Sequence, residues 1–540
     1  GAPNGAPPYF FSQNLFRLAE NKRNSANEPA TCNKFRISPH TCGVDKKQQK
    51  PKILSADLNE NIQNIKAVLP AEDILVYKFT SGDDVQCAAV YADGITDKEL
   101  LGSLVARPLS LAKAPKTIAE AEKLLYFPES KEAEDVQAAC GEILAGNPVL
   151  FVDGMEGGLV LGTKKVTLRA ITEPQTAITV KGPREGFIED VKTNMSLIRR
   201  RLKTPALRFK SMEVGRHSKT LVCVAYLDGI ADEKVVKEIE QRISAVDIDG
   251  VPDSSYIAKF ISKKPYSIFK QIGTTEKPDI LCAKMLEGRV AILADGSPIA
   301  LTVPYMLAED FQSSQDYYIS PFRATVSRIL RMLAVFAALY LPAAYVAAEL
   351  FKLQLIPLNL LLIISGGTQA LALSPSLEMF FLLAVLEILI EASIRMPKYV
   401  ALALSVIGAL VLGDTAVKAG IVSSPAIIIV ALSGISAYTV PDLTGTLSVL
   451  RLALVVVAGS IGTYGIILLT ALILYYLISS DSYGTPLLAP FSPLIKRDLR
   501  DTVYKTDMYA LDTRPAVFRG KNKTRLNVNN RQKEESDGQN

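Results

Sequence analysis

An apolar run that is long enough to cross a membrane, residues 378–398, contains three charged residues between its charged ends. Glu387, Glu391 and Arg395 are four positions apart, so on a helix they share one face. A charged side chain costs about 2.5–3.5 kcal/mol at the centre of an inserted helix, so this face should meet protein or water. We therefore predict that this helix lies in the interior of a helix bundle.

A plainer interpretation stays open for part of this group. Glu391 and Arg395 have the spacing of a simple i,i+4 ion pair near the end of the span, with Pro397 ending the helix. Glu387 lies in the middle of the run beside a like charge, which favours a functional role. Glu378 falls on the opposite face at the helix start, where a carboxylate suits the positive end of the helix dipole.

The chain around this segment has 540 residues and an uneven distribution of apolar side chains. Residues 1–325 alternate polar and apolar positions, 326–480 are mostly Leu, Ile, Val and Ala, and 481–540 are polar and basic. We predict an α/β soluble N-terminal region of two related subdomains, followed by an all-α polytopic membrane domain. The formal net charge of +5 is too small to indicate nucleic-acid binding.

The apolar part contains six candidate spans, at 329–349, 355–374, 378–395, 399–418, 424–441 and 452–479. The second contains Gly366 and Gly367 and is also typical of a re-entrant segment. The fourth is interrupted by Asp414 and Lys418. We therefore expect four to six crossings. The last candidate has glycines at three-residue spacing, which permits a close helix approach or a kink.

Basic residues flank both ends of this apolar part, and the first residues lack the pattern of a signal peptide. By the positive-inside rule, we expect both the N- and C-terminal regions on the cytoplasmic side. The flanking residues are Arg323, Arg328 and Arg331 before it and Lys496, Arg497 and Arg500 after it.

Two patterns recur within the N-terminal part. Residues 91–97 (YADGITD) resemble 226–232 (YLDGIAD), and 146–154 (GNPVLFVDG) resemble 288–296 (GRVAILADG). Each pattern places an Asp-Gly turn after an apolar stretch. The same order and similar offsets favour an internal duplication of one α/β unit. Before the first pattern, the sequence predicts a helix that ends at Pro70 and then two strands.

These patterns divide the chain into six parts. We expect a disordered segment over 1–52, a first α/β subdomain over 53–180, a linker helix over 181–204, a second α/β subdomain over 205–325, a transmembrane domain over 326–480 and a basic tail over 481–540. The linker helix carries Arg199, Arg200 and Arg201. A solvated face and a contact with anionic lipid or another subunit are both open for these arginines.

Residues for catalysis or metal binding are scarce. The six cysteines form no CxxC pair and there are two histidines, so we expect no metal site and no His-based catalysis. Gly157 to Gly162 have the gap of a phosphate-binding loop, but Thr163 stands where its lysine should be. We therefore expect no cofactor and no enzymatic activity.

Five motifs resemble one known family, the A subunits of the GerA-type spore germinant receptors of endospore-forming bacteria. They are GPREGF (182–187), NMSLIRRRL (194–202), TEKPD (275–279), EILIEASIRMPK (387–398) and SYGTPLLAP (482–490). The likeness covers about residues 180–515. Lys277 stands where the family usually has Arg. The residues that carry the motifs in the soluble part include Arg184, Glu185, Glu276, Pro278 and Asp279.

The resemblance implies a soluble domain that faces the spore core and an integral domain in the spore inner membrane. It also implies a complex with a transporter-like B subunit and a lipoprotein C subunit. The A subunit of this family is thought to form a ring-shaped homo-oligomer, a nutrient-gated channel that releases monovalent cations and triggers germination. A ring of carboxylates from several chains would favour cations. With this resemblance, we predict that Glu387 and Glu391, with Arg395 as partner, lie in an ion pathway or at a subunit interface.

Other functions stay open at this point. A SpoVAF-type accessory germination channel component would share the same motifs. A non-conducting membrane-anchored signalling scaffold also stays open, but it would need no carboxylates within its spans, so the charged helix argues against it. A secondary transporter would show inverted hydropathy repeats across the spans, whereas the repeats here lie in the soluble half.

Overall fold

The structure is a computed structural model of the full chain, and it describes residues 52–125, 127, 129–163, 181–352, 354, 357–359, 373–397, 400 and 415–526. The expected N-terminal segment, most of the candidate spans 355–374 and 399–418, and Gly366, Gly367 and Asp414 lie outside the described residues. All described residues belong to one contact unit, Pro51–Asn540.

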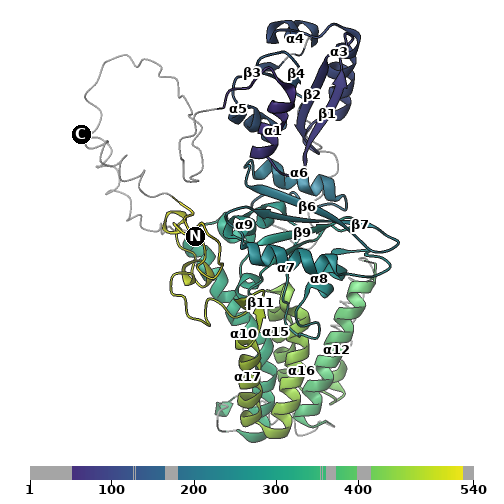
Figure 1. The fold of residues 1–540 in the computed structure, drawn as a ribbon. Coiled ribbons are helices and arrows are strands. Elements are labelled where there is room, and N and C mark those ends of the chain that lie inside the picture. Colours follow the sequence, from purple (N-terminus) through teal and green to yellow (C-terminus); the bar gives the residue numbers. More distant parts are fainter. Residues whose placement is uncertain are drawn as a thin grey trace, which may run out of the picture. The chain divides into compact units, whose positions relative to one another are not determined.

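The first sheet contains five antiparallel strands in the order β1-β2-β4-β5-β3 (Figure 1). Its inner strands are apolar at successive positions, which suits a sheet that is covered on both faces. One face packs on α1 and α5, and the other packs on α3 and α4. The elements are α1 (Leu58–Val68), β1 (Ile74–Thr80), β2 (Gln86–Ala92), α2 (Lys98–Leu100), the π-helical turn Leu101–Ala106, α3 (Arg107–Leu111), α4 (Ile118–Leu125), β3 (Ser130–Ala133), α5 (Val136–Ala145), β4 (Val149–Val152) and β5 (Gly158–Leu161).

The second sheet repeats this arrangement, in the order β6-β7-β9-β10-β8. Helices α6 and α9 pack on one face, and α7 and α8 pack on the other. The elements are α6 (Val191–Arg201), β6 (Leu207–Val214), β7 (Thr220–Leu227), α7 (Glu233–Ser244), α8 (Ser254–Ile261), β8 (Gly273–Thr275), α9 (Pro278–Glu287), β9 (Val290–Ala294) and β10 (Ala300–Val303).

The Asp-Gly turns occupy equivalent places in the two sheets. Gly94 and Gly229 follow β2 and β7 with φ of 79° and 76°, and Gly154 and Gly296 follow β4 and β9 with φ of 85° and 80°. Such left-handed backbone is accessible to glycine at little cost, which explains why this residue stands at all four turns.

The segment predicted as a linker helix belongs to the second sheet. Val191, Leu197 and Ile198 of α6 are buried in one core with Leu281 of α9 and Ala225 of β7. Asp295, at the turn after β9, accepts a hydrogen bond from the Val191 N–H, as Asp153 does from the Leu58 N–H at the start of α1. The prediction of a separate linker over 181–204 is therefore wrong for α6, because its apolar face completes a layer.

A helical region follows the second sheet, and its apolar core includes α10, α12, α15, α16 and α17 (Figure 1). Of the described helices, Pro321–Phe351 and Pro441–Ile461 are long and apolar enough to cross a membrane, by length and composition alone. The described elements are the short helices Leu307–Phe311 and Ser314–Tyr317, α10 (Pro321–Phe351), α12 (Pro375–Arg395), α14 (Ala416–Lys418), α15 (Ser424–Ala437), the short helix Pro441–Leu443, α16 (Thr444–Ile461) and α17 (Thr463–Ile478).

The predicted span 452–479 is not one continuous helix, because the chain turns within it, at one of the glycines where the sequence allowed a kink. Gly462 separates α16 from α17 with φ of 70°, and the Phe351 ring fills the space that a Cβ there would need. Helix α16 also begins at Thr444, which brings Arg451 inside an apolar helix.

The tail after α17 returns to the second sheet. Arg514 Nε donates to the Leu286 carbonyl oxygen at 2.6 Å, and the Asn522 N–H donates to the Gly229 carbonyl oxygen. Phe518 is buried beneath the guanidinium of Arg289. The described elements here are β11 (Asp481–Ser482), β12 (Thr485–Pro486), α18 (Leu499–Thr502) and the short helix Met508–Ala510.

Candidate functional site

Glu387 of α12 forms an ion pair with Arg451 of α16. The Arg451 Nη2 and Glu387 Oε1 atoms are 2.6 Å apart. The Arg451 side chain is 2% exposed and the Glu387 side chain is 28% exposed. A buried guanidinium is stable among apolar helices only when it is paired and hydrogen-bonded, so this contact fixes α12 against α16.

Two more helices join the same polar network. Arg451 Nη1 donates to Ser433 Oγ of α15 at 3.1 Å, and Ser433 Oγ donates to the Ala338 carbonyl oxygen of α10 at 2.8 Å. Glu387 is thereby linked through Arg451 and Ser433 to the α10 backbone. The network places one anion and one cation where four apolar helices meet.

Glu391 and Arg395 pair with each other and are not joined to Glu387. The Arg395 Nη2 and Glu391 Oε1 atoms are 2.6 Å apart, with side chains that are 78% and 61% exposed. The plainer i,i+4 pairing therefore describes their contact within one chain.

The sequence analysis did not identify Arg451 as a site residue. Its last candidate span was 452–479, which begins one residue after this arginine. A signal was present: Arg451 is the single Lys, Arg, Asp or Glu in the apolar sequence 444–461. Its ionic partner is 64 positions away, a distance at which helical periodicity carries no information.

Glu378 serves a neighbouring helix as well as its own. It lies in the first turn of α12, as expected, but it is fully buried and its Oε1 accepts a hydrogen bond from the Ser423 N–H, at the start of α15. The Glu378 carboxylate therefore accepts a hydrogen bond from a backbone N–H at the N-terminus of α15 that has no partner within that helix.

Arg199 joins the two sheets. Its Nε and Nη2 atoms donate to the two carboxylate oxygens of Asp73 at 2.7 and 2.8 Å, and its guanidinium lies over the Phe209 ring. Both charged side chains are buried. The sequence left open a solvated face and a contact with lipid or another subunit for Arg199, whereas in the folded chain its side chain is buried in this intramolecular contact.

Arg200 and Arg201 both bind Glu185 of the GPREGF motif, at 2.5 and 2.6 Å. Burial opposes ionisation of Glu185, but the two arginines outweigh it and lower the pKa of this carboxyl. All three side chains are partly exposed, so a further contact of Arg200 or Arg201 with lipid or another subunit stays a prediction. Arg184 is exposed beside them.

The TEKPD motif begins α9. Pro278 is buried at the first helical position, and the Glu276 carbonyl oxygen accepts the Phe187 N–H at 2.8 Å, which ties this motif to GPREGF. Asp279 Oδ2 accepts the Tyr318 hydroxyl at 3.0 Å. Burial and the Asp279 carboxylate raise the pKa of Tyr318 to about 12.

The SYGTPLLAP motif attaches the end of α17 to the second sheet. Ser482 Oγ accepts the Tyr305 N–H at 3.0 Å and donates to the Gln271 carbonyl oxygen at 2.7 Å. The Tyr483 hydroxyl donates to the Ile261 carbonyl oxygen at 2.6 Å. These bonds explain why a turn just after an apolar helix contains Ser and Tyr.

Comparisons with known proteins identify the class. The chain matches the family model described as Bacillus/Clostridium GerA spore germination protein over residues 60–517. It is 34% identical over 487 residues to spore germination protein KA of Bacillus subtilis (strain 168), which covers 88% of this chain and 90% of that protein. It is 35% identical over 482 residues to the uncharacterized membrane protein YfkQ of the same strain, with 88% and 93% covered.

Among solved structures, the chain is similar to the N-terminal domain of the A subunit of the Bacillus megaterium spore germinant receptor GerK3. The identity is 29% and the TM-score is 0.38, with 47% of this chain and 97% of that chain covered. From the family model and the relatives, this chain belongs to the GerA family of spore germination proteins.

Proposed function

We propose that this chain is the A subunit of a nutrient germinant receptor whose copies form a ring in the spore inner membrane and conduct monovalent cations. Support for a germination role comes from the family and from relatives that are named spore germination proteins. Support for a membrane location comes from the two helices of spanning length and from the likeness to a relative named a membrane protein.

The observation that carries the channel proposal is the charged face of α12. Glu391 and Arg395 are 61% and 78% exposed in the single chain, on a helix that is mostly apolar. Lipid would oppose each charge by about 2.5–3.5 kcal/mol at the centre of a span, and by less at the end of α12, where these two residues lie. Water or a second copy of the chain would remove that cost. A ring of copies would place several Glu391 carboxylates around one path.

Glu387 also supports the channel proposal. One of its oxygens is held by Arg451, while the side chain is 28% exposed. The ion pair fixes where this carboxylate sits. A fixed carboxylate beside an aqueous path attracts cations and repels anions.

The topology and partners are part of the proposal. We infer four to six crossings with both ends on the spore-core side, a transporter-like B subunit and a lipoprotein C subunit as partners, and no enzymatic activity. Nutrient binding elsewhere in the complex would then open the path.

Ion flux through the purified full-length chain in lipid vesicles tests this function, with and without its partner subunits. We expect K⁺ efflux with a preference over Cl⁻, and we expect the Glu391→Gln variant to lose several-fold in that preference because the path loses charge.

Glu240→Gln is the matched control, since Glu240 pairs with Lys210 on the surface of the second sheet. Its flux should equal that of the wild type. Absence of flux in every combination of subunits would favour the signalling scaffold. Unchanged selectivity in Glu391→Gln and Glu387→Gln would remove these residues from the path.

A further inference from the structure

The loop after α8 is bonded to the ends of two apolar helices. This loop, residues 262–272, connects α8 to β8. Thr446 Oγ1, in the first turn of α16, donates to the Ile268 carbonyl oxygen at 2.8 Å. The Tyr476 hydroxyl, near the end of α17, donates to Ser267 Oγ at 2.8 Å. The loop is therefore fixed at the end of the apolar region where α16 begins and α17 finishes.

Packing holds the same loop in place. The Phe269 ring is stacked on the Tyr476 ring with centroids 6.1 Å apart, and it is buried in the core of the apolar helices. Lys264 Nζ donates to Ser480 Oγ, just after α17, at 3.3 Å. The side chains of the loop that point away from these contacts are therefore presented at a defined place.

Four large apolar or aromatic side chains of α8 and the loop are exposed. Tyr266 is 97% exposed and Ile268 is 51% exposed. Tyr256 and Phe260, four positions apart on α8, are 40% and 43% exposed, while the opposite face of this helix is buried against the second sheet. Large apolar groups are unfavourable in water, so a set of them held in place indicates a surface that meets an apolar partner.

The apolar helices expose large side chains close to this loop. Val449 of α16 is 55% exposed and follows Thr446 by three positions. On α17, Tyr475 and Ile478 are 72% and 55% exposed, on either side of Tyr476 along the sequence. With these helices in a bilayer, as proposed above, α8 and the loop lie at the boundary between lipid and water.

The charge of this segment is one-sided. Residues 254–272 contain four lysines and no Asp or Glu; the lysines are Lys259, Lys263, Lys264 and Lys270. Lys259 Nζ lies 5.8 Å from the centre of the Tyr256 ring, and Lys264 is bonded to a hydroxyl. Neither of these two lysines forms an ion pair within the part of the chain that the structure describes. Their charge is available to an external anion.

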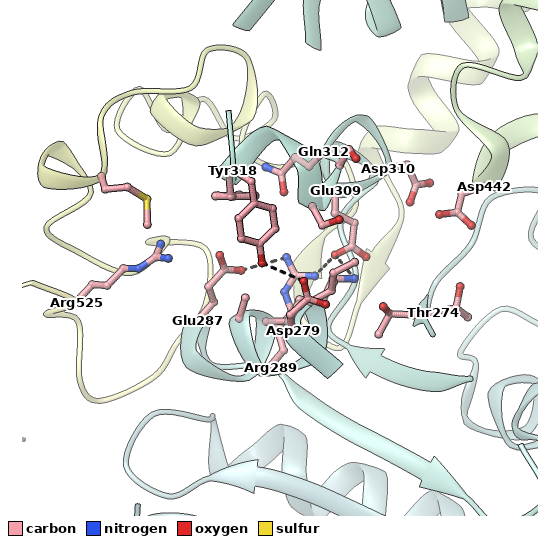
Figure 2. Close-up of a pocket in the computed structure, with 18 residues that line it drawn as sticks. Thr274, Asp279, Glu287, Arg289, Glu309, Asp310, Gln312, Tyr318, Asp442 and Arg525 are labelled. Atoms are coloured by element: carbon pink, nitrogen blue, oxygen red, sulfur yellow. Dashed lines mark hydrogen bonds and ion pairs between the residues drawn. The ribbon is translucent and has the colours of Figure 1, made fainter. Parts of the chain in front are cut away.

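The other two lysines neutralise the carboxylates beside the loop. Lys263 lies 3.4 Å from Glu238 and 3.9 Å from Asp481, and Lys270 lies 2.5 Å from Asp442. Asp442 also borders a cavity of about 340 Å³ beside α9, whose walls come from four stretches of the chain (Figure 2). Carboxylates of that wall are paired with lysine, arginine or tyrosine side chains of the same chain. Acidic groups near the loop are thus offset internally.

We propose that the outer face of α8 and the loop 262–272 lie in the headgroup region of an anionic lipid bilayer. Tyrosine suits this region because its ring is apolar and its hydroxyl is polar. Lysine can lay its apolar stem along the surface while its ammonium group meets lipid phosphate. The inference rests on the membrane location proposed above, and it adds a lipid contact made by the second sheet's own helix layer.

Single tryptophans test this contact, because the chain contains no tryptophan of its own. The variant Tyr266→Trp is placed in the full-length protein, in vesicles of phosphatidylcholine and phosphatidylglycerol brominated near the headgroup end of the acyl chains. Bromine quenches a tryptophan that touches it. Tyr475→Trp reports lipid at α17, and Tyr77→Trp, 43% exposed on β1 of the first sheet, is the control away from lipid. We expect quenching of Tyr266→Trp and Tyr475→Trp, and none of Tyr77→Trp.

The outcomes separate this contact from the membrane location itself. Quenching of Tyr475→Trp without quenching of Tyr266→Trp would overturn the lipid contact and leave the helices in the bilayer. Absence of quenching in both would overturn the contact together with the membrane location. A blue-shifted but unquenched Tyr266→Trp emission would show that protein, such as a second copy of the chain, covers the surface instead of lipid.

Lys259→Gln, combined with the Tyr266→Trp reporter, tests the role of charge. We expect brominated phosphatidylglycerol to quench the reporter more than brominated phosphatidylcholine at the same mole fraction. Loss of one lysine should lower this preference about fivefold. Lys66→Gln is the matched control, because Lys66 is exposed on α1 of the first sheet, and it should leave the preference unchanged. Equal quenching by the two lipids in the parent reporter would overturn the assignment to an anionic surface.

Discussion

At the scale of single residues, the helical region depends on one buried arginine. Arg451 forms an ion pair with Glu387 on α12 and donates a hydrogen bond to the Ser433 hydroxyl on α15. That hydroxyl in turn donates to a backbone carbonyl oxygen of α10. The exposed pair of Glu391 and Arg395, on the same helix as Glu387, has no such role within one chain. The two pairs contain the same residue types but differ in exposure. The Glu387–Arg451 pair has a buried arginine and joins two helices, whereas the Glu391–Arg395 pair is exposed to solvent.

The variant Arg451→Leu should destabilise the chain strongly. It leaves Glu387 among apolar helices without its cation, and removal of one partner of a buried pair costs about 3–5 kcal/mol. Thermal unfolding in detergent measures the loss. Arg395→Leu, which breaks an exposed pair worth about 0–1 kcal/mol, is the control.

The double variant Glu387→Leu/Arg451→Leu should regain most of that stability, since no unpaired charge is left. Equal midpoints for Arg451→Leu and Arg395→Leu would show that the Glu387–Arg451 contact contributes little.

At the scale of elements, the turn between α16 and α17 depends on one glycine. Gly462 combines a left-handed backbone with close contact to the Phe351 ring of α10. The turn changes one long apolar run into two packed helices. It also accounts for the error in the predicted span, because the sequence at 452–479 has the length of a single helix.

The variant Gly462→Ala tests this turn. A Cβ there would lie 2.8 Å from Phe351 Cδ2, and the backbone would be strained, so we expect a loss on the order of 1–3 kcal/mol in unfolding free energy.

Gly445→Ala is the control for this change, because a Cβ at Gly445 of α16 meets nothing within 4 Å. Stability there should stay the same or rise slightly, as alanine favours helix over glycine. A similar loss in both variants would mean that the turn does not need glycine.

At the scale of the whole molecule, ion pairs join the apolar helices to the rest of the chain. Asp316 lies just before α10 and binds Arg328 and Arg331 of that helix. Arg328 also donates to the Asp501 carbonyl oxygen of the tail. The segment after the second sheet and the tail therefore meet at one buried arginine of α10, Arg328.

Stability should fall in acid through Asp316. Burial raises the pKa of this carboxyl, but Arg331 and Arg328 outweigh it, and the net pKa is below the ordinary 3.8. The contribution is therefore complete above pH 3.8 and is lost as the pH falls through the lower folded-state pKa. Urea unfolding between about pH 5 and pH 2 should show this loss, and Asp316→Asn should reduce the slope. An equal slope in both proteins would assign the acid sensitivity to other groups.

The sequence predicted local features better than distant contacts. The helix that ends near Pro70, the strands β1 and β2, and the repeated Asp-Gly turns follow from periodicity and turn chemistry, and the structure confirms them. The partner of Arg199 is 126 positions away, and no spacing rule finds it. The cavity beside α9 joins four stretches, so only the folded chain reveals it.

Ser482 gives the hairpin after α17 a mechanical role. Its hydroxyl holds Gln271, just before β8, and Tyr305, just after β10, and these two strands are paired at one edge of the second sheet. An axial displacement of α17 would therefore pull on both strand ends together or break both bonds. Through this one side chain, force on the last apolar helix reaches the edge of a sheet more than 170 positions earlier in the chain.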